Sequence, residues 1–189
     1  MSRKPHVERM AEYNAWMNSR LYAAAGRLPA DELARDRRAF FGSILGTLNH
    51  IVVADTIWLQ RFAGLPGQHT ALDPLRGMLP QMPMALDAVP FPDFDALSAH
   101  RVMLDAMIGR WVASLSEDDL RHVLPYGNTQ GRHFEREVFG LLMHFFNHQT
   151  HHRGQTTTLL SQAGIDVGVT DLLVLLPDAH IAGTAPHPH

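Results

Sequence analysis

Residues 137–160 read EVFGLLMHFFNHQTHHRGQTTTLL, and this stretch decides the fold. Each residue of an α-helix advances by ~100° around the helix axis. At that spacing one face collects five mostly apolar side chains: Val138, Leu141, Phe145, Thr156 and Leu159. The pattern predicts a long helix over roughly residues 135–163, with Gly164 as its stop.

Two histidines interrupt the apolar face of this helix. Steps of three and four residues place His148 and His152 where leucine is expected, and Gln155 follows them. Histidines at positions i and i+4 are separated by ~6 Å along the axis and ~40° around it, so both imidazoles can point at one metal ion. The residue after His148 is Gln149, so the glutamate base of helical metalloproteases is missing and a protease is not indicated.

Two other histidines of the helix lie on or beside this face, and a nearby arginine does not. His144 lies one turn before His148 on nearly the same line, and His151 lies on the flank. Arg153 is expected to point to the opposite side of the helix.

Hydrophobic spacing predicts three further helices, over roughly residues 6–28, 40–63 and 93–115. The second, FFGSILGTLNHIVVADTIWLQRFAG, is apolar almost all round, so it should be buried on more than one side. The third should bury the stripe Leu97, Val102, Leu104, Met107, Ile108, Trp111 and Leu115, and the three tryptophans, Trp16, Trp58 and Trp111, should pack in the core. These helices predict an all-α four-helix bundle.

The segments between the predicted long helices also contain residues that indicate local structure. Residues 65–92 contain six Pro and two Gly and indicate a long irregular loop of the kind that often covers a site. Ser116 with Asp119 predicts a helix cap, residues 124–134 predict a turn or small hairpin before the last long helix, and residues 170–176 predict a short helix or an edge segment.

His50, in the middle of the second helix, is the candidate third ligand. Its face carries small residues, Ser43, Gly46, Thr47 and Ala54, which should leave room for an ion and for a molecule bound to it. Three imidazoles with an open position are typical of a catalytic or ligand-binding metal site. The alternative is a hydrogen-bonded polar patch without metal, its ring nitrogens satisfied by Asn49, Gln155 or water. The tail histidines, His180, His187 and His189, are expected to be solvated.

Composition narrows the remaining possibilities. The chain has 189 residues, a net charge of −3, 46 % hydrophobic residues and no cysteine. We expect a single domain over residues 1–177 and a disordered tail over 178–189. The absence of a basic excess argues against a nucleic-acid partner, and apolar runs far shorter than ~20 residues argue against a membrane span. No targeting segment is visible, and the expected location is the cytoplasm.

Several stretches resemble the DinB-like family of metal-binding proteins: AEYNAWMN near the N-terminus, TLNH with Asp55 and WL in the second helix, NHxxxHRGQ in the fourth, and GIDVGVTDLLV near the end. The resemblance implies a four-helix bundle with a divalent ion, zinc or nickel among others, bound by His50, His148 and His152. It also implies frequent homodimers, and thiol-dependent enzymes are among the relatives.

Two functional hypotheses follow. In the first, the protein is an enzyme acting on a small-molecule substrate. A thiol-dependent S-transferase with a low-molecular-weight thiol as cosubstrate is favoured over a metal-dependent hydrolase. Asp55 and Arg153 would then have supporting roles, and His144 and His151 would assist proton transfer. In the second, the protein is a non-catalytic metal-binding stress-response protein.

Overall fold

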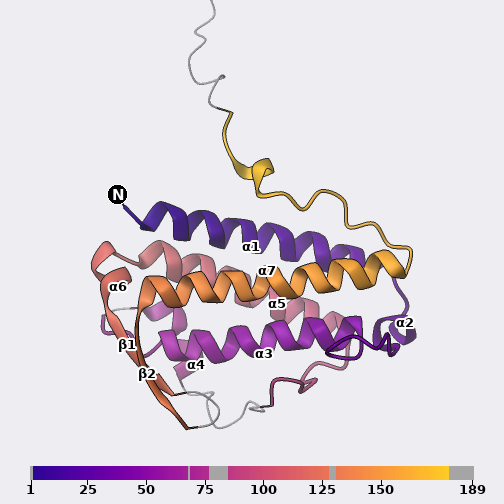
Figure 1. Ribbon diagram of the computed structural model, residues 1–189, viewed down its shortest axis with the longest axis horizontal. Coiled ribbons are helices and arrows are strands. Elements are labelled where there is room, and N and C mark those ends of the chain that lie inside the picture. Colours follow the sequence, from indigo (N-terminus) through magenta and orange to yellow (C-terminus); the bar gives the residue numbers. More distant parts are fainter. Residues whose placement is uncertain (1, 68, 77–84, 128–130, 179–189) are drawn as a thin grey trace, which may run out of the picture.

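A computed structural model of the protein describes residues 2–67, 69–76, 85–127 and 131–178 (Figure 1). In this part of the chain four long helices form a bundle: α1 (Lys4–Ala25), α3 (Ile44–Phe62), α5 (Phe94–Ser114) and α7 (Val138–Gln162). Helix α1 packs against α5 and α7, and α3 packs against α7. The predicted all-α four-helix bundle is confirmed, with helix ends that differ from the predicted ones by a few residues. No helix among the described residues has the length and hydropathy needed to cross a membrane.

Side-chain caps explain where these helices begin. The Ser43 hydroxyl accepts a hydrogen bond of 2.9 Å from the Gly46 amide at the start of α3, and Asp93 accepts one of 2.8 Å from the Ala96 amide at the start of α5. Ser116 and Asp119 form a reciprocal capping box at the short helix α6 (Glu117–Arg121), as predicted. Caps of this kind satisfy amides that have no partner within the helix.

The segment before α7 is a small antiparallel hairpin of β1 (Val123–Gly127) and β2 (His133–Glu137). Its register pairs Leu124 with Arg136 and Tyr126 with Phe134. Since side chains alternate between the faces of a strand, these four residues share one face, and the burial of Leu124 identifies it as the inner face. The predicted turn or hairpin is therefore a hairpin that leads directly into α7.

The described parts of the segment 65–92, residues 65–67, 69–76 and 85–92, contain more regular structure than its composition indicated. They contain the short helices η1 (Thr70–Leu72) and α4 (Asp73–Arg76), because Leu72 and Leu75 are buried against the bundle. His69 is also buried, with Nε2 3.6 Å from an Asp119 carboxylate oxygen. Another short helix, α2 (Ala30–Ala34), connects α1 to the segment before α3.

Stacked aromatic rings form the centre of the core. The Phe62 and Trp111 rings lie 4.8 Å apart, and Phe145 meets Phe62 edge-on. Trp58, by contrast, is only half-buried, and Val102 is 67 % exposed. The prediction that Val102 belongs to the buried stripe of α5 was wrong, since α5 turns that face outward beside α1.

After α7 the chain runs back along the outside of α1 (Figure 1). The Tyr13 hydroxyl donates a 2.7 Å hydrogen bond to the Thr170 carbonyl oxygen, and Arg9 donates one of 2.8 Å to that of Leu175. The predicted short helix over residues 170–176 is the 3₁₀ turn η2 (Leu172–Leu175). The predicted disorder over 178–189 concerns residues that, apart from Asp178, lie outside the described ones.

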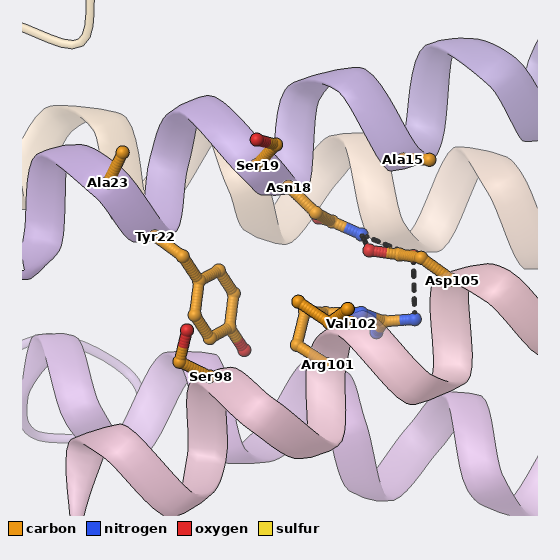
Figure 2. A pocket seen from close by; sticks show the side chains of 9 residues that line it. All are labelled: Ala15, Asn18, Ser19, Tyr22, Ala23, Ser98, Arg101, Val102 and Asp105. Carbon is orange, nitrogen blue, oxygen red and sulfur yellow. Dashed lines mark hydrogen bonds and ion pairs between the residues drawn. The ribbon is translucent and has the colours of Figure 1, made fainter.

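A buried network of charged and amide groups joins all four long helices. Arg101 of α5 pairs with Asp55 of α3 at 2.5 Å and with Asp105 one turn further along α5 at 2.8 Å. From α1, the Asn14 and Asn18 amides donate to Asp105, and Figure 2 shows Asn18 and Arg101 converging on this carboxylate.

Helix α7 completes the network through Gln149, whose amide donates to Asp55 at 2.8 Å. Burial disfavours the charged form of Arg101, but Asp105 and Asp55 outweigh this effect and raise its pKa. Burial raises the pKa of Asp55 to about 6 against the opposing effect of Arg101, so its carboxylate is mainly ionised at neutral pH.

Replacing Asp55 with alanine should therefore strongly destabilise the bundle. The substitution leaves a buried guanidinium with one of its two carboxylates and an amide without its acceptor, and breaking a buried ion pair costs about 3–5 kcal/mol. The measurement is the free energy of unfolding in urea. Arg121→Ala is the control, because its pair with Asp118 is exposed and its loss should change little. Equal effects of the two substitutions would contradict the proposed importance of the network.

Candidate metal centre

Three imidazoles converge between α3 and α7. The Nε2 atom of His50 lies 3.3 Å from that of His148 and 3.2 Å from that of His152, and the latter two are 3.1 Å apart. His50 and His152 are buried, and His148 is half-buried. The three histidines that the sequence singled out therefore meet at one point inside the bundle.

Hydrogen bonds on the far side of two rings fix their tautomers. His50 Nδ1 faces the Leu86 carbonyl oxygen at 2.7 Å, and His152 Nδ1 faces the Gln155 side-chain oxygen at 2.8 Å. Both partners accept hydrogen bonds, so both Nδ1 atoms carry the proton and both Nε2 atoms present a lone pair to the common point. His148 can supply at most one proton to the cluster. Without a metal, the Nε2 atoms of His50 and His152 therefore face each other with a lone pair each and no proton between them.

The spacing of the nitrogens fits a divalent ion. Zinc binds imidazole at about 2.0–2.1 Å with tetrahedral angles, which places the ligating nitrogens ~3.3 Å from one another. The observed separations, from 3.1 to 3.3 Å, match this value. Three neutral nitrogen donors are also a ligand set that zinc and nickel accept. The residues present thus fit a metal centre.

The imidazoles are held in the neutral form that a metal requires. Burial, reinforced by the neighbouring imidazoles, lowers the pKa of His148 to about 3. Burial also lowers the pKa of His50, where the bond to Leu86 partly opposes it, and that of His152, where the bond to Gln155 does. Because metal ligation uses the neutral ring, these shifts remove the competition from protons near neutral pH.

Phe41, just before α3, forms one wall of the cluster. Its ring stacks on His50 with the centroids 3.8 Å apart and meets His152 edge-on at 5.5 Å. Gly46 makes this possible, because a Cβ atom there would lie 2.2 Å from the Phe41 carbonyl oxygen. The small residue at position 46 was predicted to leave room for the ion and its ligand, but the backbone of Phe41 takes that room.

Asn49 anchors the loop that closes over His50. Its side-chain nitrogen donates to the Phe91 carbonyl oxygen at 3.0 Å, and its side-chain oxygen accepts from the Phe91 amide at 2.9 Å. This pair of bonds fixes the returning end of the loop, which brings the Leu86 carbonyl to His50. Asn49 thus holds the loop and bonds none of the three imidazoles. Of the two side chains that the metal-free alternative offered as partners for the ring nitrogens, only Gln155 takes that role.

The other α7 residues that the sequence singled out lie outside the cluster of three imidazoles. His144 is exposed and its ring lies 6.0 Å from that of His148, while His151 is exposed with its ring 4.8 Å from that of His152. Arg153 is buried, bonded to the Asn14 side chain and, at 3.1 Å, to Thr150. Arg153 lies off the metal face, as predicted, and it is buried because α1 covers that side of α7.

Sequence reasoning missed three groups: the Leu86 carbonyl, the Phe41 ring and Arg101. The contact through the Leu86 carbonyl has no sequence signal, since any residue offers a carbonyl oxygen, and Phe41 lies outside the regular spacing of α3. Arg101 was not singled out, although an arginine within the apolar stripe of α5, four residues before Asp105, is a detectable signal.

A cavity of about 460 Å³ lies on another side of the bundle, between α1 and α5. Asn18, Tyr22, Arg101 and Asp105 line it, as Figure 2 shows, and none of the three clustered histidines does. It adjoins the buried charge network and not the candidate metal centre.

Comparison with known proteins agrees with this fold. The family model described as the DinB family matches residues 1–181. The chain is 27 % identical over 164 residues to Protein DinB of Bacillus subtilis (strain 168), covering 86 % of this chain and 89 % of that protein. A crystal structure of a DinB-like protein from Bacillus cereus ATCC 10987 is 19 % identical and superposes with a TM-score of 0.54, covering 81 % of this chain and 89 % of that one. At that identity the structural match supports the fold alone.

Replacing Asn49 with alanine should loosen the loop over His50. The substitution removes both hydrogen bonds to the Phe91 backbone, and leaving buried polar groups without partners costs about 1–3 kcal/mol each. We expect a lower free energy of unfolding in urea and faster proteolysis within residues 85–92. The control is Asn147→Ala on the exposed face of α7, which should stay within about 0.5 kcal/mol of the parent. A protease-resistant loop in the Asn49 variant would show that other contacts hold it.

Proposed function

The chain belongs to the DinB family, and on that premise we propose that it binds one divalent metal ion, zinc or nickel, through the Nε2 atoms of His50, His148 and His152. The observation that carries the proposal is the pair of fixed tautomers, which aims two lone pairs at one point between three Nε2 atoms that lie 3.1–3.3 Å from one another. Opposed lone pairs repel unless a cation lies between them. The metal-free polar patch lacks that cation.

The same geometry favours a site that accepts an external ligand. Among the described residues the group of candidate ligands contains three histidines and no fourth His, Cys, Asp or Glu. A divalent ion held there would act as a Lewis acid and lower the pKa of a thiol or water molecule that binds it. The chain has no cysteine, so a thiol ligand must come from a cosubstrate.

We therefore favour a thiol-dependent S-transferase acting on a small-molecule substrate. A hydrolase would need a carboxylate base close to the site, and Asp55 cannot serve because Arg101 and Gln149 occupy both of its oxygens. His151 is exposed beside His152, which suits it to carry a released proton to solvent. The Gln155 amide lies 3.3 Å from His151 Nε2 and holds that ring in place. Homodimer formation and a cytoplasmic location remain predictions.

The first test is metal content. Protein purified without a nickel column should contain about one equivalent of zinc or nickel by elemental analysis. Metal affinity should fall by more than about 100-fold in each of His50→Ala, His148→Ala and His152→Ala. Loss of a residue that only hydrogen-bonds to a metal ligand typically costs about 10- to 100-fold. The control is His133→Ala, an exposed residue of the hairpin, which should bind metal like the parent. Protein that stays metal-free in the presence of excess zinc would overturn the proposal.

A second test separates the enzyme from a non-catalytic metal protein. Cobalt-substituted protein titrated with 2-mercaptoethanol should develop a thiolate-to-cobalt charge-transfer band in the near ultraviolet, because the three histidines leave a position open. The same titration of His148→Ala should give no such band. If the parent shows no band, and chelation of the metal unfolds the bundle, the ion has a structural role and the transferase is wrong.

A further inference from the structure

A cavity of about 550 Å³ lies between α3, α7 and the inner face of the hairpin. Trp58 contributes from α3, Tyr126 and Arg136 from the hairpin, and Gly140 and His144 from α7. A volume of this size suits a small organic molecule. A Cβ atom at Gly140 would meet no other atom within 4 Å, so the α7 wall of the cavity is open at that residue.

The cavity adjoins the candidate metal centre through a continuous row of rings. The His144 ring lies 6.0 Å from that of His148 on one side and 5.1 Å from that of Trp58 on the other. Trp58 in turn lies 5.4 Å from Tyr126. A molecule with one end at His148 can therefore extend past His144 into the cavity.

Two arginines lie on or beside the cavity wall. Arg136 is the one charged residue among the four on the inner face of the hairpin, and Arg61 of α3 lies over the Trp58 and Tyr126 rings at 4.5 and 5.2 Å. No described carboxylate forms an ion pair with either guanidinium. Glu137, which also lines the cavity, is already paired with Arg3. The two arginines would repel a cationic ligand, and their charges are available to an anion.

We propose that this cavity binds the carboxylate end of a small organic molecule with an apolar body. Arg136 pairs with the carboxylate, Arg61 adds a second positive charge, and the Trp58 and Tyr126 rings contact the apolar body. Guanidinium groups recognise carboxylates through parallel hydrogen bonds, and aromatic walls favour an apolar body. The inference rests on the proposed function, since it assigns a chemical class to the substrate or cosubstrate of the adjacent metal centre.

The test is calorimetric titration of the full-length protein, zinc-loaded and chelator-treated, with 3-phenylpropionate. We expect binding that is roughly 10- to 100-fold weaker for the neutral 3-phenylpropionamide and in Arg136→Gln, as for the loss of a charge-assisted hydrogen bond. Gly140→Leu should abolish binding, because its side chain extends into the cavity without a backbone clash. Both variants should bind zinc like the parent.

Matched controls are Arg110→Gln and Gly109→Leu on the exposed side of α5, where a Cβ atom at position 109 also meets nothing within 4 Å. Both should bind 3-phenylpropionate like the parent. Equal binding of acid and amide, or unchanged binding in Arg136→Gln or Gly140→Leu, would overturn the inference while leaving the metal proposal intact. Binding of the acid to protein that cannot be loaded with zinc would support the anion site and overturn the metal proposal.

Discussion

The buried ion pair between Asp55 and Arg101 constrains how the long helices lie against one another. It connects α3 to α5, Asp105 extends it to the asparagines of α1, and Gln149 extends it to α7. Charges removed from water are tolerated only when they are paired and hydrogen-bonded, so a slip of one helix by a turn, ~5.4 Å, would leave a buried charge without a partner. The network therefore specifies the register of the helices more than it adds to their stability, which the aromatic and aliphatic core supplies.

The same register places the candidate ligands. Asp55 follows His50 by five residues in α3, and Gln149 directly follows His148 in α7, so their hydrogen bond aligns the two helices next to the imidazoles. Local contacts then set the orientation of each ring. Phe41 limits the tilt of His50, and hydrogen bonds at Nδ1 turn the Nε2 atoms of His50 and His152 inward. The geometry of the site thus depends on charge pairing deep in the bundle and on hydrogen bonding at its edge.

Periodicity was sufficient to predict the helices and the convergence of three histidines. Both signals can be read from the sequence alone: a pair of histidines at positions i and i+4, and a polar residue within an apolar helix. Periodicity did not predict whether a side chain is buried where the burial depends on a neighbouring helix that covers that side. Arg153 lies off the apolar stripe of α7 yet is buried, because α1 packs on that side, whereas Val102 is apolar yet exposed. The role of Gly46 could not be predicted either, since the close approach of Phe41 is a contact between backbones. The spacing of residues along one helix can identify the face that packs in the core, but it does not show whether another helix covers the opposite face.

Charge balance connects the candidate metal centre with the adjacent cavity. Three neutral imidazoles would contribute no negative charge to a divalent ion, and Asp55, the buried acid of α3, is already paired with Arg101. An ion bound there would keep its full double charge, and Arg61 and Arg136 lie along the path that leads away from it. A groove lined by one sign of charge with apolar walls concentrates ligands of the opposite sign. With the proposed ion bound, the metal centre and the two arginines would together favour a ligand that carries a metal-binding donor atom at one end and a carboxylate at the other. A neutral or cationic molecule of the same shape would leave the charges of the groove unbalanced.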